Sequence, residues 1–411
     1  MKKIVLCLIG IINLIIYVYV LSIDTIPNNI ILFADEDLNI NTLFGITCEK
    51  VLKNEEPEAI QVSSNLNKNT VGEKSTLLLK LFNKITLKEV EVDVISDVKV
   101  VPVGNIIGLK LYTKGVLVVG MNEIENVKNE VSKPYENAGI AEGDIIVSVN
   151  NNAITCTSDL LEEVKKSGGK EIEIKYLRKG NLYETGIIPQ KTEDNQFKLG
   201  LWVRDSAAGV GTITYYEPST GRFAALGHGI LDIDTRALVE IANGEIVTAD
   251  ILSVQKGEKG IPGEIRGSIV NGNTIGKISK NTDIGIYGTL ENLSQLNIDT
   301  SKSIEIAKRN EIKIGKAKII CTLENNETKE YEVEIQKIDI LNNENNKSMI
   351  IKITDKELLE KTNGIIQGMS GSPIIQNGKL VGAITQVFVS SPNMGYGVFA
   401  DLMIKEMKKT E

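Results

Sequence analysis

The sequence predicts a mainly β protein with one apolar helix at its N-terminus and a small α+β domain ahead of a larger β domain. Three observations support this fold class. Residues 4–23 are almost entirely apolar, residues 101–192 combine strand-like runs with one amphipathic helix, and the chain after Lys198 consists of short β-type runs separated by glycines. The 411 residues, 42% of them hydrophobic and 24% charged, suffice for two or three domains and exclude a disordered chain.

Charge and residue counts exclude several classes of function. Acidic residues outnumber basic ones by 54 to 46 and only 5% of residues are aromatic, so we expect no nucleic acid partner. His228 is the single histidine, which excludes zinc sites that need two or three imidazoles. The 4 cysteines have no CxxC spacing. We therefore expect neither a metal nor a cofactor.

Residues 1–25 are predicted to form a signal anchor, which is an uncleaved transmembrane helix. Lys2 and Lys3 precede an apolar run that is interrupted only by Asn13 and Ser22. At about 1.5 Å per residue this run is roughly 30 Å long, enough to span a bilayer core. Positive charge before the run favours an orientation that places the rest of the chain on the extracytoplasmic side of the membrane. A cleaved signal peptide is the alternative, although no A-x-A-like cleavage site follows the run.

Residues 26–100 are predicted to form a membrane-proximal linker followed by a small β region. The stretch up to about Ser64 is polar and rich in asparagine, with no strong hydrophobic period. From Ser75 the pattern is β-like, and Val90, Val92 and Val94 alternate with acidic residues as in a half-buried strand.

Residues 101–192 resemble a PDZ domain of the bacterial, periplasmic-protease type. The resemblance rests on residues 137–149, which read NAGIAEGDIIVSV, on the preceding Ile107-Gly108-Leu109, and on a helix and a hairpin expected after them. In PDZ domains a glycine-containing loop exposes N–H groups to a peptide carboxylate while the peptide adds a strand. The resemblance implies that Ile107, Gly108 and Leu109 form this peptide-binding loop. A spacer that binds no peptide is the alternative.

The region 195–411 contains a candidate pair of catalytic residues. Ser370 lies in the run Gly368-Met369-Ser370-Gly371-Ser372-Pro373, which looks like the nucleophile loop of chymotrypsin-like serine peptidases. Small neighbours permit a tight turn that presents the Ser370 hydroxyl and aims the N–H groups of Gly368 and Ser370 at a developing oxyanion. Serine needs a base, and His228, between two glycines, is the only imidazole. The order His then Ser fits the chymotrypsin-type arrangement.

Several assignments stay open at this point. Ser372 is an alternative nucleophile, and a Ser–Lys dyad with Lys379 or Lys352 is conceivable, although it leaves the Gly-His-Gly segment without a role. A carboxylate should orient the imidazole. Spacing does not choose among four candidates for it, namely Asp232, Asp234, Asp283 and Asp355.

Together these segments resemble the stage IV sporulation protein B peptidase family of endospore-forming bacteria. The resemblance rests on the apolar N-terminus, the PDZ block, Leu-Gly-His-Gly-Ile at 226–230, Gln-Gly-Met-Ser-Gly-Ser-Pro at 367–373, and the segments 200–209 and 354–358. It implies a serine endopeptidase with a chymotrypsin-like double β-barrel and a triad of His228, Asp355 and Ser370. An acid placed just before the nucleophile loop is unusual, because chymotrypsin-like enzymes normally supply it from the first barrel.

The family resemblance also implies a role and a location. The enzyme would be secreted from the forespore into the space between the two spore membranes and would cleave itself near its N-terminus. It would then cleave a membrane-bound inhibitor, which frees an intramembrane metalloprotease that processes pro-sigma-K. The expected partners are peptide substrates, its own N-terminal region, this inhibitor and the membrane.

Two other functions are alternatives to this one. The first is a membrane-tethered PDZ scaffold with an inactive peptidase-like domain, which gives no reason to keep both His228 and Ser370. The second is a quality-control protease of broad specificity. In such proteases the PDZ domain usually follows the peptidase, whereas here it precedes it.

Overall fold

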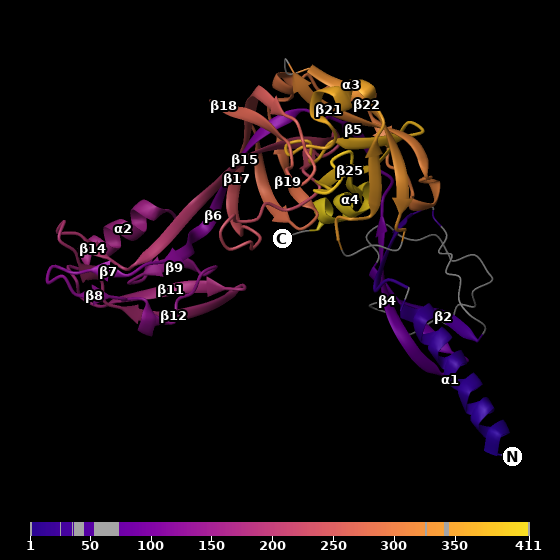
Figure 1. The fold of residues 1–411 in the computed structure, drawn as a ribbon, viewed down its shortest axis with the longest axis horizontal. Coiled ribbons are helices and arrows are strands. Elements are labelled where there is room, and N and C mark those ends of the chain that lie inside the picture. Colours follow the sequence, from indigo (N-terminus) through magenta and orange to yellow (C-terminus); the bar gives the residue numbers. More distant parts are fainter. Residues whose placement is uncertain are drawn as a thin grey trace.

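A computed structural model describes residues 2–24, 26–34, 36, 45–52, 74–324, 327–340 and 345–409 of the chain. The PDZ-like region lies at one end of an elongated molecule, two β-barrels lie in the middle, and the N-terminal helix lies at the other end (Figure 1). The sheets hold most of the ordered residues, so the predicted mainly β class is confirmed.

The N-terminal region consists of one helix and one small sheet. Helix α1 (Lys2–Asp24) is followed by four strands in the order β1-β4-β3-β2, namely β1 (Asn29–Phe33), β2 (Ile46–Leu52), β3 (Lys74–Leu81) and β4 (Ile85–Ile95). The alternating valines predicted to form a strand lie in β4 and are buried. Much of the segment expected to contain a self-cleavage site, residues 37–44 and 53–73, lies outside the described residues.

Over the part of the chain that the structure describes, no helix is long and apolar enough to cross a membrane. The side chains at positions 1–8, 12 and 15 of the predicted signal anchor lie outside that part.

The PDZ-like region is a sheet covered by one helix. Its first strand is the second half of β6 (Ile106–Met121). The elements that follow are β7 (Ile124–Glu125), β8 (Val131–Ser132), η1 (Glu136–Ala138), β9 (Ile145–Val149), β10 (Asn152–Ala153), α2 (Thr157–Lys166), β11 (Ile172–Arg178), β12 (Asn181–Ile187), β13 (Gln190–Lys191) and β14 (Phe197–Lys198). Leu160 and Val164 of α2 pack with Ile146 and Ile174 of the sheet in one buried cluster. The amphipathic helix and the hairpin of the sequence prediction are thus both present.

Two barrels form the rest of the molecule. In the first, pairing runs from β6 (Ile106–Met121) through β17 (Ile241–Gln255), β18 (Glu264–Thr282), β19 (Gly285–Leu290), β16 (Arg222–Ala225) and β15 (Leu201–Glu217), and β15 pairs with β6 again. Because the pairing returns to its first strand, these six strands form a closed ring. The edge strands β5 (Lys99–Pro102) and β20 (Ile304–Glu305) extend the sheet beyond β15.

The second barrel is closed and stands before the C-terminal helix. Its strands are β21 (Gly315–Glu324), β22 (Glu327–Ile338), β23 (Met349–Ile353), β26 (Met394–Phe399), β25 (Lys379–Val387) and β24 (Pro373–Gln376), in this pairing order. Three short 3₁₀ turns, η2 (Leu293–Leu296), η3 (Thr300–Lys302) and η4 (Arg309–Glu311), connect the barrels. Helix α3 (Lys356–Thr362) precedes the nucleophile loop, and α4 (Ala400–Lys408) packs against the core of this barrel. The double barrel of the sequence prediction is therefore present.

Two long strands belong to both the PDZ-like region and the first barrel. In β6, Ile107 and Leu109 lie in the core of the first barrel, whereas Val116 and Val118 lie in the PDZ core. Lys114-Gly115 forms no turn, and β6 continues through it. The neighbouring β15 pairs with β6 along most of its length. A domain boundary at residue 101 or 195 therefore divides a sheet that the structure keeps continuous.

Candidate active site

The loop between α3 and β24 carries Ser370, the predicted nucleophile. Gly368 and Gly371, on either side of it, both have φ of +98°. A Cβ at Gly371 would lie 2.1 Å from the Thr212 carbonyl oxygen, which only glycine avoids. The glycines of the motif are thus required by the turn, and Ser370 between them remains partly exposed.

Some N–H groups of this loop are bonded to backbone carbonyls and others are free. The bonded ones donate to backbone carbonyls as Gln367 to Gly263 (2.8 Å), Met369 to Ile366 (3.1 Å), Gly371 to Ile384 (2.7 Å) and Ser372 to Met369 (3.0 Å). The N–H groups of Gly368 and Ser370 have no hydrogen-bond partner among the described residues. These are the two groups predicted from the motif as oxyanion donors, and both are available to a ligand.

His228 lies in the loop between β16 and β17, directly after two residues of unusual backbone conformation. Leu226 has φ of +67° and Gly227 has φ of +68°. The His228 Nδ1 atom lies 2.8 Å from the carbonyl oxygen of Gly229. Since a carbonyl only accepts, Nδ1 carries the hydrogen and the neutral ring keeps a free lone pair on Nε2. Burial lowers the pKa of the imidazole, although the Gly229 hydrogen bond opposes this.

The nucleophile loop and the histidine loop both contact Thr385 of β25. The Ser370 hydroxyl donates to the Thr385 carbonyl oxygen at 2.7 Å. A Cβ at Gly227, next to His228, would lie 2.9 Å from the Thr385 Cγ2 atom. Between the described residues His228 and Ser370 there is no direct hydrogen bond: the His228 Nδ1 atom and the Ser370 hydroxyl are each bonded to a backbone carbonyl. To use this hydroxyl as a nucleophile, Ser370 would have to turn away from the Thr385 carbonyl.

Asp355, the acid implied by the family resemblance, forms the N-cap of α3. Its carboxylate accepts hydrogen bonds from the N–H groups of Leu358 (3.0 Å) and Glu332 (3.3 Å). An aspartate directly before a helical run is a common capping signal, so the sequence also contained this role. The structure does not bring Asp355 into a hydrogen bond with His228.

None of the other three carboxylate candidates forms a described hydrogen bond with His228. Asp232 and Asp234 accept hydrogen bonds from Arg204 at 2.6 and 2.8 Å, and Asp283 is exposed. Burial opposes the ionisation of Asp232, but the N–H groups of Thr235 and Asp234, the Thr235 hydroxyl and Arg204 together lower its pKa.

The alternative nucleophile and bases are poorly placed. The Ser372 hydroxyl is fully buried and has no hydrogen-bond partner within the described ranges. Lys379 forms ion pairs with Glu311 (2.8 Å) and Glu305 (3.4 Å), and Lys352 lies in β23. No cluster of three or more metal-ligating side chains occurs among the residues that the structure describes.

Ile107, Gly108 and Leu109, predicted as a peptide-binding loop, lie instead near the start of β6. This segment pairs with β15 on one side and with β17 on the other, and Ile107 and Leu109 are at most 1% exposed. Their place in the barrel core leaves no open loop for a peptide carboxylate, so the structure corrects this expectation.

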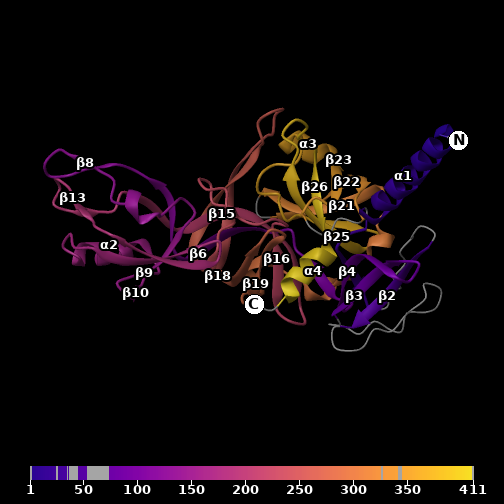
Figure 2. The ribbon, with the colours of Figure 1, turned by 90° about the horizontal axis from the view of Figure 1, so that it is seen from below.

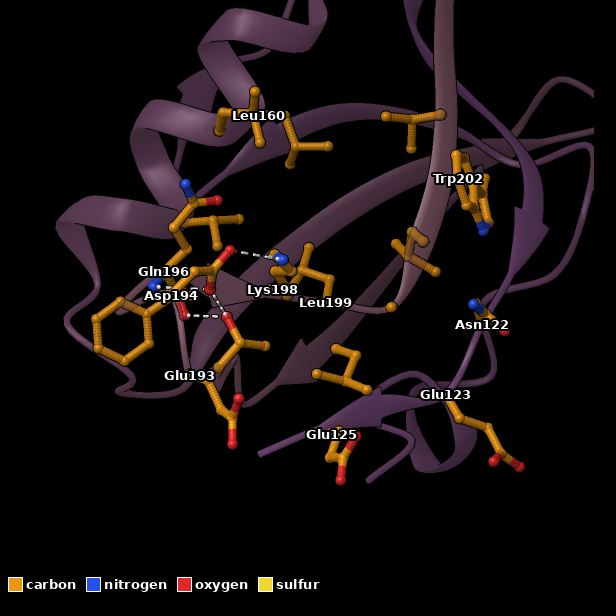
Figure 3. Close-up of a pocket in the computed structure, with 18 residues that line it drawn as sticks. Asn122, Glu123, Glu125, Leu160, Glu193, Asp194, Gln196, Lys198, Leu199 and Trp202 are labelled. Atoms are coloured by element: carbon orange, nitrogen blue, oxygen red, sulfur yellow. Dashed lines mark hydrogen bonds and ion pairs between the residues drawn. The ribbon is translucent and has the colours of Figure 1, made fainter. Parts of the chain in front are cut away.

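A different segment of the PDZ-like region borders a groove. Figure 3 shows this groove of about 650 Å³ between α2, which contributes Leu160 and Val164, and the segment that runs from β14 into β15. Gly200 has φ of +75° there, and Trp202 is 64% exposed. The run Leu199-Gly200-Leu201 repeats the apolar-Gly-apolar pattern of residues 107–109. That repeated pattern was the signal that sequence reasoning missed.

Known proteins resemble the two parts of the chain separately. Residues 195–404, about half of the chain, match the family described as SpoIVB peptidase S55, and residues 107–188 match the PDZ domain. The zinc metalloprotease RasP of Shouchella clausii (strain KSM-K16) is 34% identical over 88 residues, which are 21% of this chain and 20% of that protein. This match therefore spans about a fifth of the relative's length.

Two solved structures have local similarity. HtrA-type protease AlgW with a decapeptide is 13% identical, with a TM-score of 0.28 over 50% of this chain and 53% of that chain. The PDZ domain of an SdrC-like protein from Listeria monocytogenes is 15% identical, with a TM-score of 0.18 over 22% of this chain and 87% of that chain. The family match, which includes both His228 and Ser370, is the decisive one. The chain is a serine endopeptidase that belongs to the SpoIVB peptidase S55 family.

Proposed function

We propose that this chain is a self-processing endopeptidase that signals between compartments during endospore formation. It cleaves a membrane-bound inhibitor so that an intramembrane protease can process pro-sigma-K. Membership of the SpoIVB peptidase family supports this role. One observation supports the catalytic part of the proposal. Among residues 367–372 of the described loop, only two N–H groups are free, and they belong to the predicted nucleophile Ser370 and to Gly368, two residues before it.

In the proposed mechanism Ser370 first leaves the Thr385 carbonyl and turns to Nε2 of His228. Nε2 takes the hydroxyl proton as Oγ attacks the peptide carbonyl carbon, and the resulting oxyanion accepts hydrogen bonds from the N–H groups of Gly368 and Ser370. His228 then gives its proton to the leaving amine, which leaves an acyl group on Ser370. A water molecule, deprotonated by His228, hydrolyses this ester and restores the enzyme.

Asp355 is proposed as the third catalytic residue on the family resemblance alone. The Asp355 carboxylate now caps α3. To act on the His228 imidazole, this carboxylate has to leave the cap. Asparagine caps helices about as well as aspartate. We therefore expect D355N to keep the wild-type melting temperature but to lose about 10⁴-fold in kcat, as a triad without its acid does. Activity near wild type in a folded D355N would leave Asp355 with a capping role only.

Membrane attachment and location are proposals of the same kind. We propose that α1 anchors the protein, with its folded domains outside the cytoplasm in the intermembrane space of the developing spore. Large apolar side chains exposed along α1, including Ile9 (53%), Leu14 (62%) and Tyr17 (60%), support an apolar environment for this helix. Self-cleavage within residues 26–100 would release the peptidase from the anchor.

The groove beside α2 is the proposed peptide site of the PDZ-like region. A peptide strand laid between α2 and β15 would place its carboxylate near Leu199-Gly200-Leu201, where the glycine permits the close approach of a backbone. The occupant proposed is a peptide substrate or the protein's own N-terminal region.

Self-cleavage of the full chain in detergent tests the proposed enzyme. Wild type, S370A and S372A are incubated and followed by intact mass. We expect wild type and S372A to shorten and S370A to stay full length, because losing a triad nucleophile costs about 10⁶-fold in rate. The fully buried Ser372 makes S372A a matched control.

Each other result has a distinct meaning. Equal shortening of wild type and S370A would exclude Ser370 as the nucleophile. If wild type does not shorten, labelling with a fluorescent phosphonate decides between the remaining functions. Labelled Ser370 supports a restrained peptidase, and unlabelled Ser370 supports a scaffold with an inactive peptidase-like domain.

A further inference from the structure

Thr212, in the middle of β15, contacts both catalytic loops at once. Its N–H donates to the Ser370 carbonyl (3.1 Å), and its hydroxyl donates to the Gly368 carbonyl (2.8 Å). Its own carbonyl accepts from the N–H of Leu226 (3.1 Å), two residues before His228. Thr212 itself is only 2% exposed, so these contacts start from a buried point of β15.

In the nucleophile loop, Thr212 bonds the carbonyls of two peptide groups, those of Gly368 and Ser370. The carbonyls of Gly368 and Ser370 belong to the peptide planes on either side of the Met369–Ser370 peptide, which carries one oxyanion N–H. Gly368 and Gly371 both have φ of +98°, and glycine leaves such planes free to rotate at little steric cost. Two hydrogen bonds from one buried residue therefore keep the oxyanion N–H groups aimed at the same place.

In the histidine loop, Thr212 holds a strained backbone. Leu226 has φ of +67°, which costs energy for a residue with a side chain and persists only where its surroundings enforce it. The Thr212 carbonyl bonds the Leu226 N–H, and a Cβ at the adjacent Gly211 would lie 2.7 Å from Leu226 Cδ1. The turn that leads to His228 is thus packed against the same point of β15.

We infer that Thr212 is a positioning residue of this peptidase. It acts through Gly368 and Ser370 to hold the oxyanion donors, and through Leu226 to set where His228 lies relative to Ser370. This inference rests on the proposed roles of Ser370 and His228, and it assigns a separate role to a residue outside the motifs.

Thr214 provides a matched control on the same strand. It lies two residues further along β15, where the pairing with β16 shifts register between Ile213 and Tyr215. It is 0% exposed, and its hydroxyl has no hydrogen-bond partner within the described ranges. Replacing this threonine by valine removes a buried hydroxyl from the same strand without removing a contact to either catalytic loop.

The experiment measures phosphonate labelling of Ser370 in wild type, T212V, T212S and T214V of the full chain in detergent. The rate is followed against phosphonate concentration, so that the maximal labelling rate and the half-saturating concentration are separated. We expect T212V to lower the maximal rate about 10²-fold, as a misplacement near the reacting atoms does. We expect the half-saturating concentration to stay within about threefold, because Thr212 does not touch the ligand.

T212S and T214V show whether slower labelling of T212V is caused by loss of the Thr212 hydroxyl. T212S keeps the hydroxyl and should label within about threefold of wild type, and T214V should label like wild type. Wild-type labelling by T212V, or a T212S as slow as T212V, would overturn the role of the hydroxyl. An unlabelled wild type would instead overturn the proposed catalytic function. If T212V does not fold, T212A with T214A as its control makes the same comparison.

Discussion

The imidazole of His228 shows how a single residue is prepared for its chemistry by its surroundings. The Gly229 carbonyl holds the hydrogen on Nδ1 and so leaves Nε2 as the acceptor that a general base needs. Burial disfavours the charged ring and lowers its pKa. Burial favours the neutral base, whereas the Gly229 hydrogen bond sets the tautomer and partly offsets the effect of burial on the pKa. No carboxylate is bonded to the ring among the described residues.

We expect the lowered pKa of His228 to appear in the pH profile of Ser370 labelling. Labelling needs the neutral base, so the rate should fall as pH drops through the pKa of His228. Since burial places that pKa below the ordinary 6.5, the midpoint of the acid limb should lie below 6.5. The measurement is the labelling rate between about pH 4.5 and 8. A midpoint above 6.5 would show that a carboxylate joins the imidazole in the working enzyme.

The first residues of strand β15 contact both the PDZ-like region and the histidine loop. Trp202 borders the groove, Arg204 forms ion pairs with Asp232 (2.6 Å) and Asp234 (2.8 Å) in the loop after His228, and Asp205 accepts a hydrogen bond from the N–H of Thr157 (2.7 Å) at the start of α2. That N–H lowers the pKa of the Asp205 carboxyl, which keeps it charged at the helix N-terminus. Groove, helix and histidine loop are therefore connected within four residues of one strand.

Replacing Arg204 by methionine should damage this connection. R204M leaves the buried Asp232 carboxylate without its cation, although the N–H groups of Asp234 and Thr235 still bind it. We expect a loss of about 1–3 kcal/mol in the free energy of unfolding and slower labelling of Ser370. Urea unfolding and the labelling rate measure the two effects.

Arg266 is the control for this change. Its guanidinium pairs with Glu264, but both side chains are largely exposed (60% and 39%). R266M should therefore change the free energy of unfolding by less than about 1 kcal/mol. Equal effects of R204M and R266M would contradict the argument that burial of Asp232 makes the Arg204 contact important.

The whole molecule is held together across the barrels by its C-terminal helix. Figure 2 shows the PDZ-like region and α1 at opposite ends, with α4 between the first barrel and the N-terminal sheet. Lys405 of α4 bonds Asp93 (2.6 Å) and Asn29 (2.9 Å) of that sheet, and Lys408 bonds Ser96 (2.6 Å). The N-terminal sheet is thus docked on α4 and is more than a flexible spacer.

Loss of the Lys405 contacts should loosen this docking. The ion pair is largely buried, with 17% and 22% of the two side chains exposed. We expect K405M to lower protection from hydrogen exchange in β1 and β4 and to leave β25 unchanged. K409M is the control, because Lys409 is exposed and its described ion pair is with Glu406, three residues earlier in the chain. It should change hydrogen exchange neither in β1 and β4 nor in β25. Unchanged exchange in K405M would show that apolar contacts alone hold the sheet.

Local requirements explain which features could be predicted. Ser370 was predictable because the turn around it needs glycine at φ of +98°, and this need is visible as Gly368 and Gly371. The segment that borders the groove was not predictable, since the same apolar-Gly-apolar pattern occurs at 107–109 and at 199–201. Only the strands that pair with each copy decide which one is buried in a barrel and which borders a groove.

The sequence by itself determined the mainly β class, the enzyme family and the candidate nucleophile and base, because each depends on residues that are close together in the chain. Tertiary structure alone decided the tautomer of His228, the capping position of Asp355 and the role of Thr212. The Thr212 hydroxyl and the carbonyl that it bonds are separated by 156 residues. Contacts over such separations leave no period or spacing in a single sequence, since they form only when the two barrels close on each other.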